Sequence, residues 1–536
     1  MVDVTEEIIF TGSKPTVDRQ TRRLAASEKL RKVHSSIYTS NLTEPLESIG
    51  LRHALEIAGH LFPGAVLSGR TAKEMHASRA LRQDGSRTGP GFVFLCHVKA
   101  RRSVALPGVQ ISAIHGAGPQ PGDFPLLTLY AASIARALLD NLTSSRSVKG
   151  PSRTLSRAEV EQWLDKLCEP EGELHLNRIR DDARALAPAL GLQSEFAQLE
   201  RIIGALLRTR EARLTSPVAT ARSKGLPYDD ASVKRCTILA AALRSTGLPE
   251  TAREPPSAES RIAASFIEAY FSNYIEGTRF VVEEAKRIVF DGVVPVQRSQ
   301  DGHDVLATYR QLVNLGTRAP STISTTDFEE EIKARHADLM SGRPENAPGE
   351  YKQQPNAAGN TLFVSPGRVR GTLHAGLAIV NGIEHPFGRA VLLHFLLADV
   401  HPFVDGNGRI SRIMMTKELL ASGLSRITIP TVWREDYLGA LRALNRFDDP
   451  GPIIRAFAFA QRVTVACAAL TVDEAIRSWA SCHAFVEAGA HARLTLPQTA
   501  ANIVWRDSIP APADYWALVE LGGGSGFAAI AQRSVG

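Results

Sequence analysis

The segment from 151 to 246 keeps its hydrophobic residues on one side of a helix. They recur at positions i, i+3, i+4 and i+7, the spacing of an amphipathic helix. Two runs show this spacing: Val160, Trp163, Leu164 and Leu167, and then Leu199, Ile202, Ile203 and Leu206. Ser156 and Glu159 have the spacing of a capping box before the first run. With the polar stretch 247–259, which we interpret as a loop, the pattern predicts a helical linker region over 151–259.

Short apolar runs separated by glycine and proline turns precede this region. Residues 92–98, 103–106 and 109–114 predict a small sheet, and residues 133–141 predict a helix. Together these elements predict a small α/β domain over 43–150.

The first part of the chain is basic, and its hydrophobic spacing predicts a helix and then a strand over 17–40. We interpret 30–39 as the end of a recognition helix leading into a wing, and residues 1–42 as winged-helix-like. A basic helix with a wing can lie on DNA through phosphate contacts, and the alternative is a solvated basic face. The order of the pieces over 1–150 resembles the AbiEi-type antitoxin and transcriptional-regulator domain, which implies a regulatory α/β domain without chemistry of its own. The basic residues in this first part of the chain are Arg19, Arg22, Arg23, Lys29, Arg31 and Lys32.

The twelve residues 401–412 read His-Pro-Phe-Val-Asp-Gly-Asn-Gly-Arg-Ile-Ser-Arg. Gly406 and Gly408 bracket Asn407, so the backbone can turn tightly and present successive N–H groups as an anion nest. The apolar run 410–420 that follows predicts a helix, and the free amides and dipole at its N-terminus favour phosphate.

Charged side chains surround this nest. Arg409 and Arg412 share a face of the first helical turn, where cations are unfavourable unless an anion lies between them and the dipole. Asp405 is a hard oxygen ligand, and Mg²⁺ takes one or two carboxylates together with substrate phosphates. His401 can accept a proton near neutral pH. The set predicts nucleotide phosphoryl chemistry.

The string H-x-F-x-D-G-N-G-R-x-x-R over 401–412 resembles the signature of the Fic family, whose members mostly transfer AMP from ATP to a protein hydroxyl. The resemblance covers 260–463 and implies an all-α core with one short β-hairpin, the flap, at 360–366. A flap can hold the backbone of a target by β-augmentation. Lys352 stands where many relatives carry arginine, and we assign no function to it; His394 is expected to be a core histidine. The flap residues expected to position the target are Thr361, Leu362, Phe363 and Val364.

A second string, Ser272-Asn-Tyr-Ile-Glu276-Gly277, lies on a predicted amphipathic helix. It resembles the inhibitory motif (S/T)-x-x-x-E-(G/N) of the same family. The resemblance implies that Glu276 competes with the γ-phosphate of ATP for the guanidinium of Arg412. The alternative is a surface glutamate at the end of a helix.

The resemblance therefore implies an autoinhibited protein adenylyltransferase, with ATP as a substrate and a protein or the chain itself as the target. His401 would take the proton of a Ser, Thr or Tyr hydroxyl, and Asp405 would hold Mg²⁺ or Mn²⁺. The alternatives are another nucleotide donor, removal of AMP, a DNA-binding regulator that modifies only itself, and a toxin–antitoxin fusion. A homo-oligomer stays open. The phosphate-binding residues implied are Gly406, Asn407, Gly408, Arg409 and Arg412.

Composition adds bounds to this prediction. The chain has 536 residues, of which 44% are hydrophobic and 22% charged, the balance of a globular protein. The net charge of +6 is compatible with nucleotide or nucleic-acid partners. Five scattered cysteines form no C-x-x-C pair, which argues against a zinc site or a disulfide framework.

No apolar run is long enough to span a membrane, and no secretory signal is evident, so we expect a cytoplasmic protein. The predicted fold is multidomain and mainly α. The predicted parts are a winged-helix-like module (1–42), a small α/β regulatory domain (43–150), a helical linker (151–259), an all-α Fic core with a β-hairpin flap (260–463) and a C-terminal extension (464–536).

Overall fold

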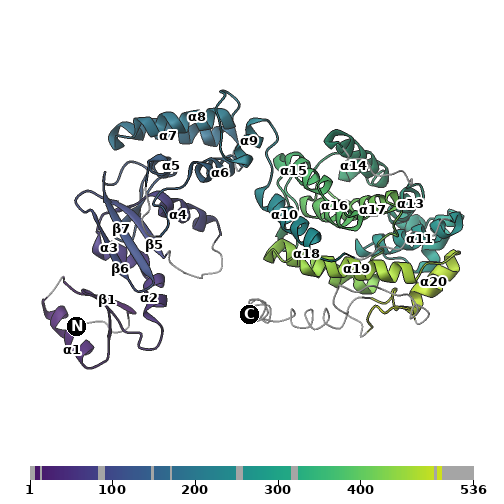
Figure 1. Cartoon of the computed structure of the whole chain (residues 1–536), viewed down its shortest axis with the longest axis horizontal. Coiled ribbons are helices and arrows are strands. Elements are labelled where there is room, and N and C mark those ends of the chain that lie inside the picture. Colours follow the sequence, from purple (N-terminus) through teal and green to yellow (C-terminus); the bar gives the residue numbers. More distant parts are fainter. Residues whose placement is uncertain are drawn as a thin grey trace. The chain divides into compact units, whose positions relative to one another are not determined.

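The computed structural model describes residues 6–12, 15–81, 91–145, 150–169, 172–248, 257–315, 324–487 and 492–497. They belong to two compact units, residues 1–225 and 226–536, drawn in purple to blue and in teal to yellow in Figure 1. Each unit has hydrophobic core clusters of its own, and each is described by itself. Within the described residues, no helix combines the length and the apolar character that crossing a bilayer requires.

The first unit begins with one helix packed on a three-stranded antiparallel sheet of order β1-β3-β2. The helix and strand predicted over 17–40 are present, but the helix ends at Ala26. We interpreted residues 30–39 as the end of a recognition helix leading into a wing. The helical part is wrong, since the β2–β3 hairpin occupies this stretch and Leu30 is buried with Ile9 and Tyr38 before it. The bounds are β1 Ile8–Phe10, α1 Pro15–Ala26, β2 Arg31–His34 and β3 Ile37–Thr39.

A six-stranded mixed sheet follows, in the order β6-β7-β5-β4-β9-β8. The three runs predicted as strands are β5, β6 and β7, and the helix predicted over 133–141 is α5, whose first turn is capped by Ser133. The strands are β4 Val66–Leu67, β5 Phe92–His97, β6 Arg102–Leu106, β7 Val109–His115, β8 Phe124–Leu126 and β9 Leu129–Ala131. The helices beside them are α2 Leu46–Arg52, α3 Ala54–Leu61, α4 Gly69–Leu81 and α5 Ile134–Leu142.

The predicted linker region is helical, but it does not form one body. Its first four helices bury their apolar faces against α5 and so complete the first unit. The predicted capping box of Ser156 and Glu159 is present at the start of α6. The second unit starts after Gly225. These helices are α6 Arg157–Leu167, α7 Glu173–Leu190, α8 Gln193–Leu206 and α9 Pro217–Ser223.

The second unit is built of helices, with one two-stranded hairpin. Almost every residue of α16 is buried, so this helix forms the centre, and α10, α15 and α17 pack on it. Its elements up to the hairpin are α10 Asp230–Ser245, α11 Ala258–Ile275, α12 Val282–Lys286, η1 Arg287–Asp291, η2 Val296–Arg298, α13 Ser299–Val313, α14 Thr325–Leu339 and η3 Pro344–Asn346. The others are β10 Ala357–Ala358, β11 Thr361–Leu362, η4 Pro366–Arg368, α15 Val369–Asn381, α16 Pro386–Val400, α17 Asn407–Ala421, η5 Thr431–Trp433, α18 Arg434–Phe447, α19 Gly451–Ala466 and α20 Val472–Ser481.

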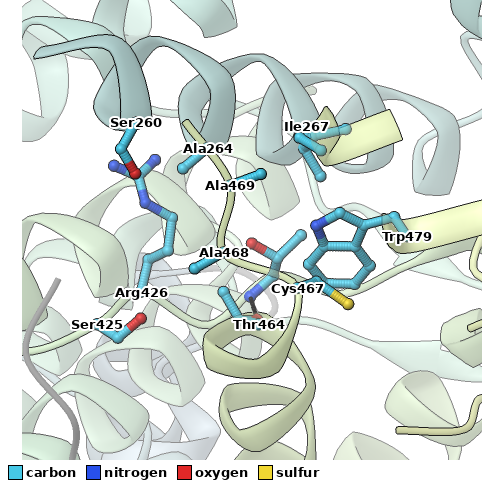
Figure 2. Close-up of a pocket in the computed structure, with 12 residues that line it drawn as sticks. Ser260, Ala264, Ile267, Ser425, Arg426, Thr464, Cys467, Ala468, Ala469 and Trp479 are labelled. Atoms are coloured by element: carbon cyan, nitrogen blue, oxygen red, sulfur yellow. Dashed lines mark hydrogen bonds between the residues drawn. The ribbon is translucent and has the colours of Figure 1, made fainter. Parts of the chain in front are cut away.

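Helix α11 carries the predicted inhibitory motif and is held by two neighbours. A buried ion pair joins its Glu268 to Arg426 (3.1 Å). Helix α20 also packs on α11, with the ring of Trp479 5.5 Å from that of Phe271, and Arg426 and Trp479 both line the small cavity shown in Figure 2. Part of the predicted C-terminal extension therefore belongs to the core of the second unit.

Two predictions fall partly or wholly outside the described residues. Of the polar loop predicted at 247–259, residues 249–256 are not described, and α11 already begins at Ala258. Of the C-terminal extension predicted at 464–536, residues 488–491 and 498–536 are not described. All five cysteines are buried free thiols.

Candidate functional site

His401 is the C-cap of α16 and lies in a cavity of about 530 Å³ between the hairpin and α18. Its backbone is left-handed (φ 52°), an uncommon conformation for a residue with a side chain. Its Nδ1 lies 3.4 Å from the carbonyl oxygen of Ala398 and donates to it, which leaves the lone pair on Nε2. Burial lowers the pKa of His401 to about 4, so the ring is neutral at pH 7.

The loop after His401 turns sharply and is locked by Asn407. The side chain of Asn407 accepts from the N–H of Phe403 (2.8 Å) and donates to its carbonyl oxygen (3.0 Å). Phe403 is fully buried, as predicted. Gly406 has φ 75°, and a Cβ there would lie 2.9 Å from the sulfur of Met340. The side chain of Asn407 therefore shapes the loop, and the amides at the N-terminus of α17 are the groups that can meet an anion.

A histidine that the sequence did not indicate supports this loop from below. His336 is fully buried on α14, and its ring stacks on that of Phe403 with centroids 3.8 Å apart. Its Nε2 lies 3.0 Å from the carbonyl oxygen of Asp405, and its Nδ1 accepts from the N–H of Gly349. Burial lowers the pKa of His336 to about 4. The neutral ring thus donates from Nε2 and holds the backbone of Asp405.

Arg412 and the predicted inhibitory motif meet, as the resemblance implied. Arg412 is buried on α17, and its NH2 donates to Oε1 of Glu276 at 2.6 Å. Its Nε donates to Oγ of Ser272 at 2.9 Å, and its NH2 also donates to the Ser272 carbonyl oxygen. Burial is the largest single influence and would lower the pKa of Arg412, but the charges of Glu276 and Tyr437 and its hydrogen bonds to them together outweigh it, so the pKa is raised.

The position of Glu276 follows from the way α11 ends. Gly277 is left-handed (φ 97°), its N–H donates to the carbonyl of Tyr274, and the N–H of Thr278 donates to the carbonyl of Asn273. This is a Schellman motif, with Glu276 as the C-cap. The carboxylate thereby reaches the first turn of α17, where a Cβ on Gly408 would lie 2.1 Å from its Oε1.

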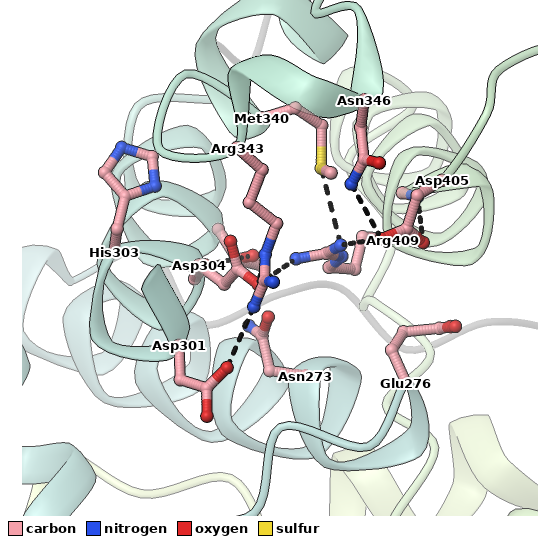
Figure 3. A network of polar contacts seen from close by, with 12 residues as sticks. Asn273, Glu276, Asp301, His303, Asp304, Met340, Arg343, Asn346, Asp405 and Arg409 are labelled. Carbon is pink, nitrogen blue, oxygen red and sulfur yellow. Dashed lines mark hydrogen bonds and ion pairs between the residues drawn. The ribbon is translucent and has the colours of Figure 1, made fainter. Parts of the chain in front are cut away.

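Arg409 takes part in a second network, on the other side of the loop (Figure 3). Its NH1 lies 2.9 Å from Oδ2 of Asp304 on α13, and both side chains are about 97% buried. Arg343 also contacts Asp304 (2.9 Å) and reaches Asp301 (2.8 Å). The Arg409 guanidinium, which was predicted to bind nucleotide, thus pairs with Asp304, and this ion pair joins α17 to α13.

Asp405 lies at the mouth of the site, with its side chain half exposed. Its Oδ1 accepts from the N–H of Gly406 (2.7 Å), and its Oδ2 lies 3.4 Å from the amide of Asn346. In the described part of the chain, no group of three His, Cys, Asp or Glu side chains could hold a metal ion by itself. One accessible carboxylate beside a phosphate site nevertheless fits Mg²⁺, because Mg²⁺ needs only one or two protein carboxylates and takes its other ligands from substrate phosphates and water.

The predicted flap is a hairpin in which Ala357 pairs with Leu362 and Ala358 with Thr361. The four predicted flap residues differ in their surroundings. Phe363 stacks on His401 with centroids 3.8 Å apart, Val364 is buried, Leu362 is exposed, and the hydroxyl of Thr361 accepts from Arg446. His394, predicted as a core histidine, is fully buried and bonded to the hydroxyl of Tyr437.

The cavity beside His401 has a wall that the sequence did not indicate. Helix α18 lines it with Tyr437, Leu438, Leu441 and Asn445. Asn445 donates from Nδ2 to Asp399 (2.8 Å), which directs its amide oxygen away from that carboxylate. The same helix adds Arg434, Arg442 and Arg446 to the lining, so the wall combines the apolar Leu438 and Leu441, one amide acceptor and three cations. The apolar part with its amide is suited to a flat, hydrogen-bonding ring.

Comparison with known proteins identifies part of the second unit. Residues 325–419 match the Fic/DOC family. This range contains a Fic domain that runs from α14 to α17, and the resemblance expected from the sequence is confirmed. The matched range includes the hairpin and the 401–412 string, but neither Glu276 nor α18.

Several curated proteins are similar over 36% of the chain. The protein adenylyltransferase Fic of Drosophila virilis is 37% identical over 205 residues, which are 36% of this chain and 41% of that protein. The protein of the same name from Drosophila melanogaster is 27% identical over 205 residues. The chain thus spans about two fifths of the length of these relatives.

Solved structures with Fic domains give weaker similarities. A Fic-domain signaling protein of Bacteroides thetaiotaomicron is 21% identical, covers 46% of this chain and 97% of its own, and has a TM-score of 0.36. Fic-1 of C. elegans is 19% identical, covers 60% of this chain and 92% of its own, and has a TM-score of 0.34.

Proposed function

We propose that this chain transfers AMP from ATP to a hydroxyl group of a protein, and that Glu276 holds the enzyme inactive. The names of the curated relatives point to this activity, and the site contains the groups that the reaction requires. A neutral histidine and the first turn of α17 line one cavity together with Glu276, a buried arginine is bonded to the Glu276 carboxylate, and Asp405 is an accessible carboxylate just before α17.

The observation that carries the proposal is the contact between Glu276 and Arg412. A carboxylate occupies the position in front of Gly408, where the amides of α17 and the guanidinium of Arg412 converge. Helix N-termini with a nearby arginine bind phosphate, so the carboxylate takes the place of an anion that the site is built to receive. A nucleotide with a terminal phosphate on Arg412 has to displace it.

The α18 wall of the cavity supports a nucleoside donor. A base lying against Leu438 and Leu441 would bring its edge to Asn445. The amide oxygen of Asn445 is an acceptor, and at position 6 adenine presents an amino donor, whereas guanine presents a carbonyl oxygen there and carries its donors at N1 and the 2-amino group. We therefore favour ATP over GTP.

The reaction would then proceed by in-line displacement. Nε2 of His401 takes the proton of the target hydroxyl as its oxygen forms a bond to the α-phosphorus. The bond from that phosphorus to the bridging oxygen breaks, and pyrophosphate leaves with the electron pair. The amides of Gly408 and Arg409 and the guanidinium of Arg412 stabilise the charge on the phosphates, because catalysis of such transfers is mostly positioning and electrostatics.

Asp405 would hold Mg²⁺ or Mn²⁺ together with the nucleotide phosphates. When bound, the ion neutralises charge on the departing pyrophosphate. Chelation of divalent metal is expected to abolish transfer by the Glu276→Gly protein, and Asp405→Ala in that background is expected to lower activity at every metal concentration. An Asp405→Ala protein with an unchanged metal titration would contradict this role.

The hairpin would present the target. The hairpin has only two residue pairs, and Leu362 on its second strand, β11, is exposed. An extended peptide can therefore pair with the free edge of β11. The target side chain would be Ser, Thr or Tyr, on another protein or on this chain.

Intact-mass analysis of the Glu276→Gly protein tests the proposed function. After incubation with ATP and Mg²⁺, the protein or an added lysate protein should gain the mass of one AMP. GTP should give less product, and Glu276→Gly/His401→Ala should give none. A Glu276→Gly protein that gains no mass with any nucleotide and any target would contradict the proposal.

Nucleic-acid binding by the first unit is a second candidate function. Arg19, Arg22 and Arg23 are all exposed on α1. Lys29, between α1 and β2, and Lys32, on β2, are exposed as well. Clustered exposed cations can bind phosphates with a salt-dependent affinity. Binding of duplex DNA that weakens with salt, and that Arg19→Ala/Arg22→Ala/Arg23→Ala removes, would support this function; equal binding by the triple variant would contradict it.

A further inference from the structure

Lys352 is a buried cation just before the hairpin, and the proposed mechanism does not use it. Its side chain is 2% exposed, and burial lowers its pKa to about 8. Within the described residues no carboxylate forms an ion pair with it. A buried ammonium is costly unless hydrogen bonds replace its water, so its hydrogen bonds show what it holds together.

The ammonium of Lys352 joins two segments. Nζ donates to Oδ1 of Asn356 at 2.6 Å and to the carbonyl oxygen of Val400 at 3.3 Å. Val400 is the last residue of α16, so its carbonyl belongs to the negative end of the helix dipole, where a cation is favourable. The backbone N–H of Lys352 also donates to the carbonyl oxygen of Pro402 (2.9 Å).

Asn356 continues this connection into the hairpin. Its Nδ2 donates to the carbonyl oxygen of Phe403 (3.0 Å), and its own carbonyl accepts from the N–H of Phe363 (3.2 Å). Both ends of the hairpin therefore attach to Asn356, and Asn356 attaches to the loop that follows His401. Phe363 in turn lies flat on the ring of His401, with an interplanar angle of 3°.

The hairpin needs such an anchor. It has two residue pairs, and an isolated two-stranded hairpin is marginal in water even when it is longer. Ala357, Ala358 and Leu362 are exposed, so packing of their side chains adds little to its stability.

We propose that Lys352 is a positioning residue: through Asn356 its ammonium holds the hairpin against His401, so that a target strand lying along the hairpin brings its hydroxyl to Nε2. The role in target binding rests on the proposed function, whereas the role in holding the hairpin does not. Its loss should loosen the hairpin and weaken binding of the target, while the phosphate site at the start of α17 keeps its geometry.

Hydrogen–deuterium exchange of the full-length protein without nucleotide tests the anchoring. Lys352→Met should speed exchange of the amides in 356–364 about tenfold, the change expected from the loss of one charge-assisted hydrogen bond. Exchange in α16 and α17 should stay as in wild type. Asn356→Ala should have the same effect, and the double variant should add little to either single change, because both act on one connection. Lys234→Met, which alters an exposed lysine of the same unit, is the control.

Unchanged exchange in 356–364 of Lys352→Met would overturn the proposal. Exchange that rises equally in α16 and α17 would overturn it as well, because Lys352 would then be a general part of the core. Kinetics in the Glu276→Gly background give the second readout: Lys352→Met should raise the KM for the acceptor several-fold and leave the KM for ATP within twofold. Equal increases in both would contradict target positioning. If Glu276→Gly itself transfers no AMP, the proposed function fails, and the exchange measurement still decides whether Lys352 anchors the hairpin.

Discussion

At the scale of single residues, His401 must be neutral to accept a proton, and its burial makes it so. Burial lowers its pKa to about 4, from an ordinary value of 6.5. The neutral form is the active form, so a lowered pKa extends activity toward acid. Between about pH 7.5 and pH 5.5 an ordinary histidine would lose about tenfold of its neutral form, whereas His401 loses little.

We therefore predict that kcat/KM for AMP transfer by Glu276→Gly changes less than twofold over this range. The rates are measured with saturating metal and with a check that the protein stays folded at each pH. A tenfold decline with a midpoint near 6.5 would show that His401 titrates as an exposed histidine, or that another base acts.

Asp304 is the sole carboxylate within 3.0 Å of Arg409 among the described residues, and both are buried. We predict that Asp304→Asn destabilises the protein by about 3–5 kcal/mol, because it removes the buried carboxylate shared by Arg409 and Arg343 and leaves Arg409 only the half-exposed Asp405, 3.7 Å away. Asp301→Asn is the matched control, since Asp301 is 30% exposed and should contribute no more than about 1 kcal/mol. Urea unfolding measures both, and equal effects of the two variants would contradict the assignment.

The sequence revealed some of these residues and not others, for a physical reason. The 401–412 string is contiguous, so its combination of glycines, charges and histidine could be read together. Asp304 and His336 come from helices far upstream, where one aspartate or one histidine is an ordinary residue. Their roles follow from contacts that only the fold creates. The predicted role of the Arg409 side chain changed for the same reason.

At the scale of elements, α20 and the residues after it form a clamp on α11. The rings of Trp479 and Phe485 pack on Phe271, and the hydroxyl of Tyr274 donates to Glu487. Since Glu276 ends α11, loosening the clamp should free its carboxylate from Arg412 part of the time.

We predict that Trp479→Ala raises automodification of the protein that retains Glu276, and that it adds nothing to Glu276→Gly. Intact-mass rates are compared at a temperature at which all variants are folded, with Leu470→Ala, an exposed change, as control. An equal gain from Trp479→Ala in both backgrounds would show that the clamp does not act through Glu276.

Hydrophobic period predicted several helices of both units but not what each helix packs against. The period of residues 230–245 marks a helix, and we assigned it to a linker. In the structure its Cys236, Leu239 and Leu243 belong to the core around α16. An apolar stripe indicates that a helix is buried, but it carries no information on its partner. The winged-helix and AbiEi resemblances of the first unit stay predictions.

At the scale of the whole molecule, the two units should be separable, and the division lies at residue 225. We predict that residues 226–536 fold and, with Glu276→Gly, transfer AMP at a rate similar to that of the full chain. Residues 247–536 should not fold stably, because they lack α10 and its buried ion pair between Arg235 and Asp399 (2.8 Å). Circular dichroism and intact-mass rates test both chains. A folded but inactive 226–536 protein would show that the first unit contributes to the site.

The central claim is that Glu276 inhibits by occupying Arg412, and one comparison tests it most directly. Initial rates of AMP incorporation are measured by intact mass for wild type, Glu276→Gly and Glu276→Gly/Arg412→Ala, all at the same ATP and Mg²⁺ concentrations. Glu276→Gly should be about tenfold or more faster than wild type. Each ~1.4 kcal/mol by which the Glu276–Arg412 pair opposes the pairing of Arg412 with ATP lowers the fraction of enzyme with correctly bound ATP tenfold, and the substitution removes this penalty. The double variant should lose this gain, since no cation remains for the phosphate. A folded Glu276→Gly protein no faster than wild type, or a double variant that keeps the full gain, would contradict the claim.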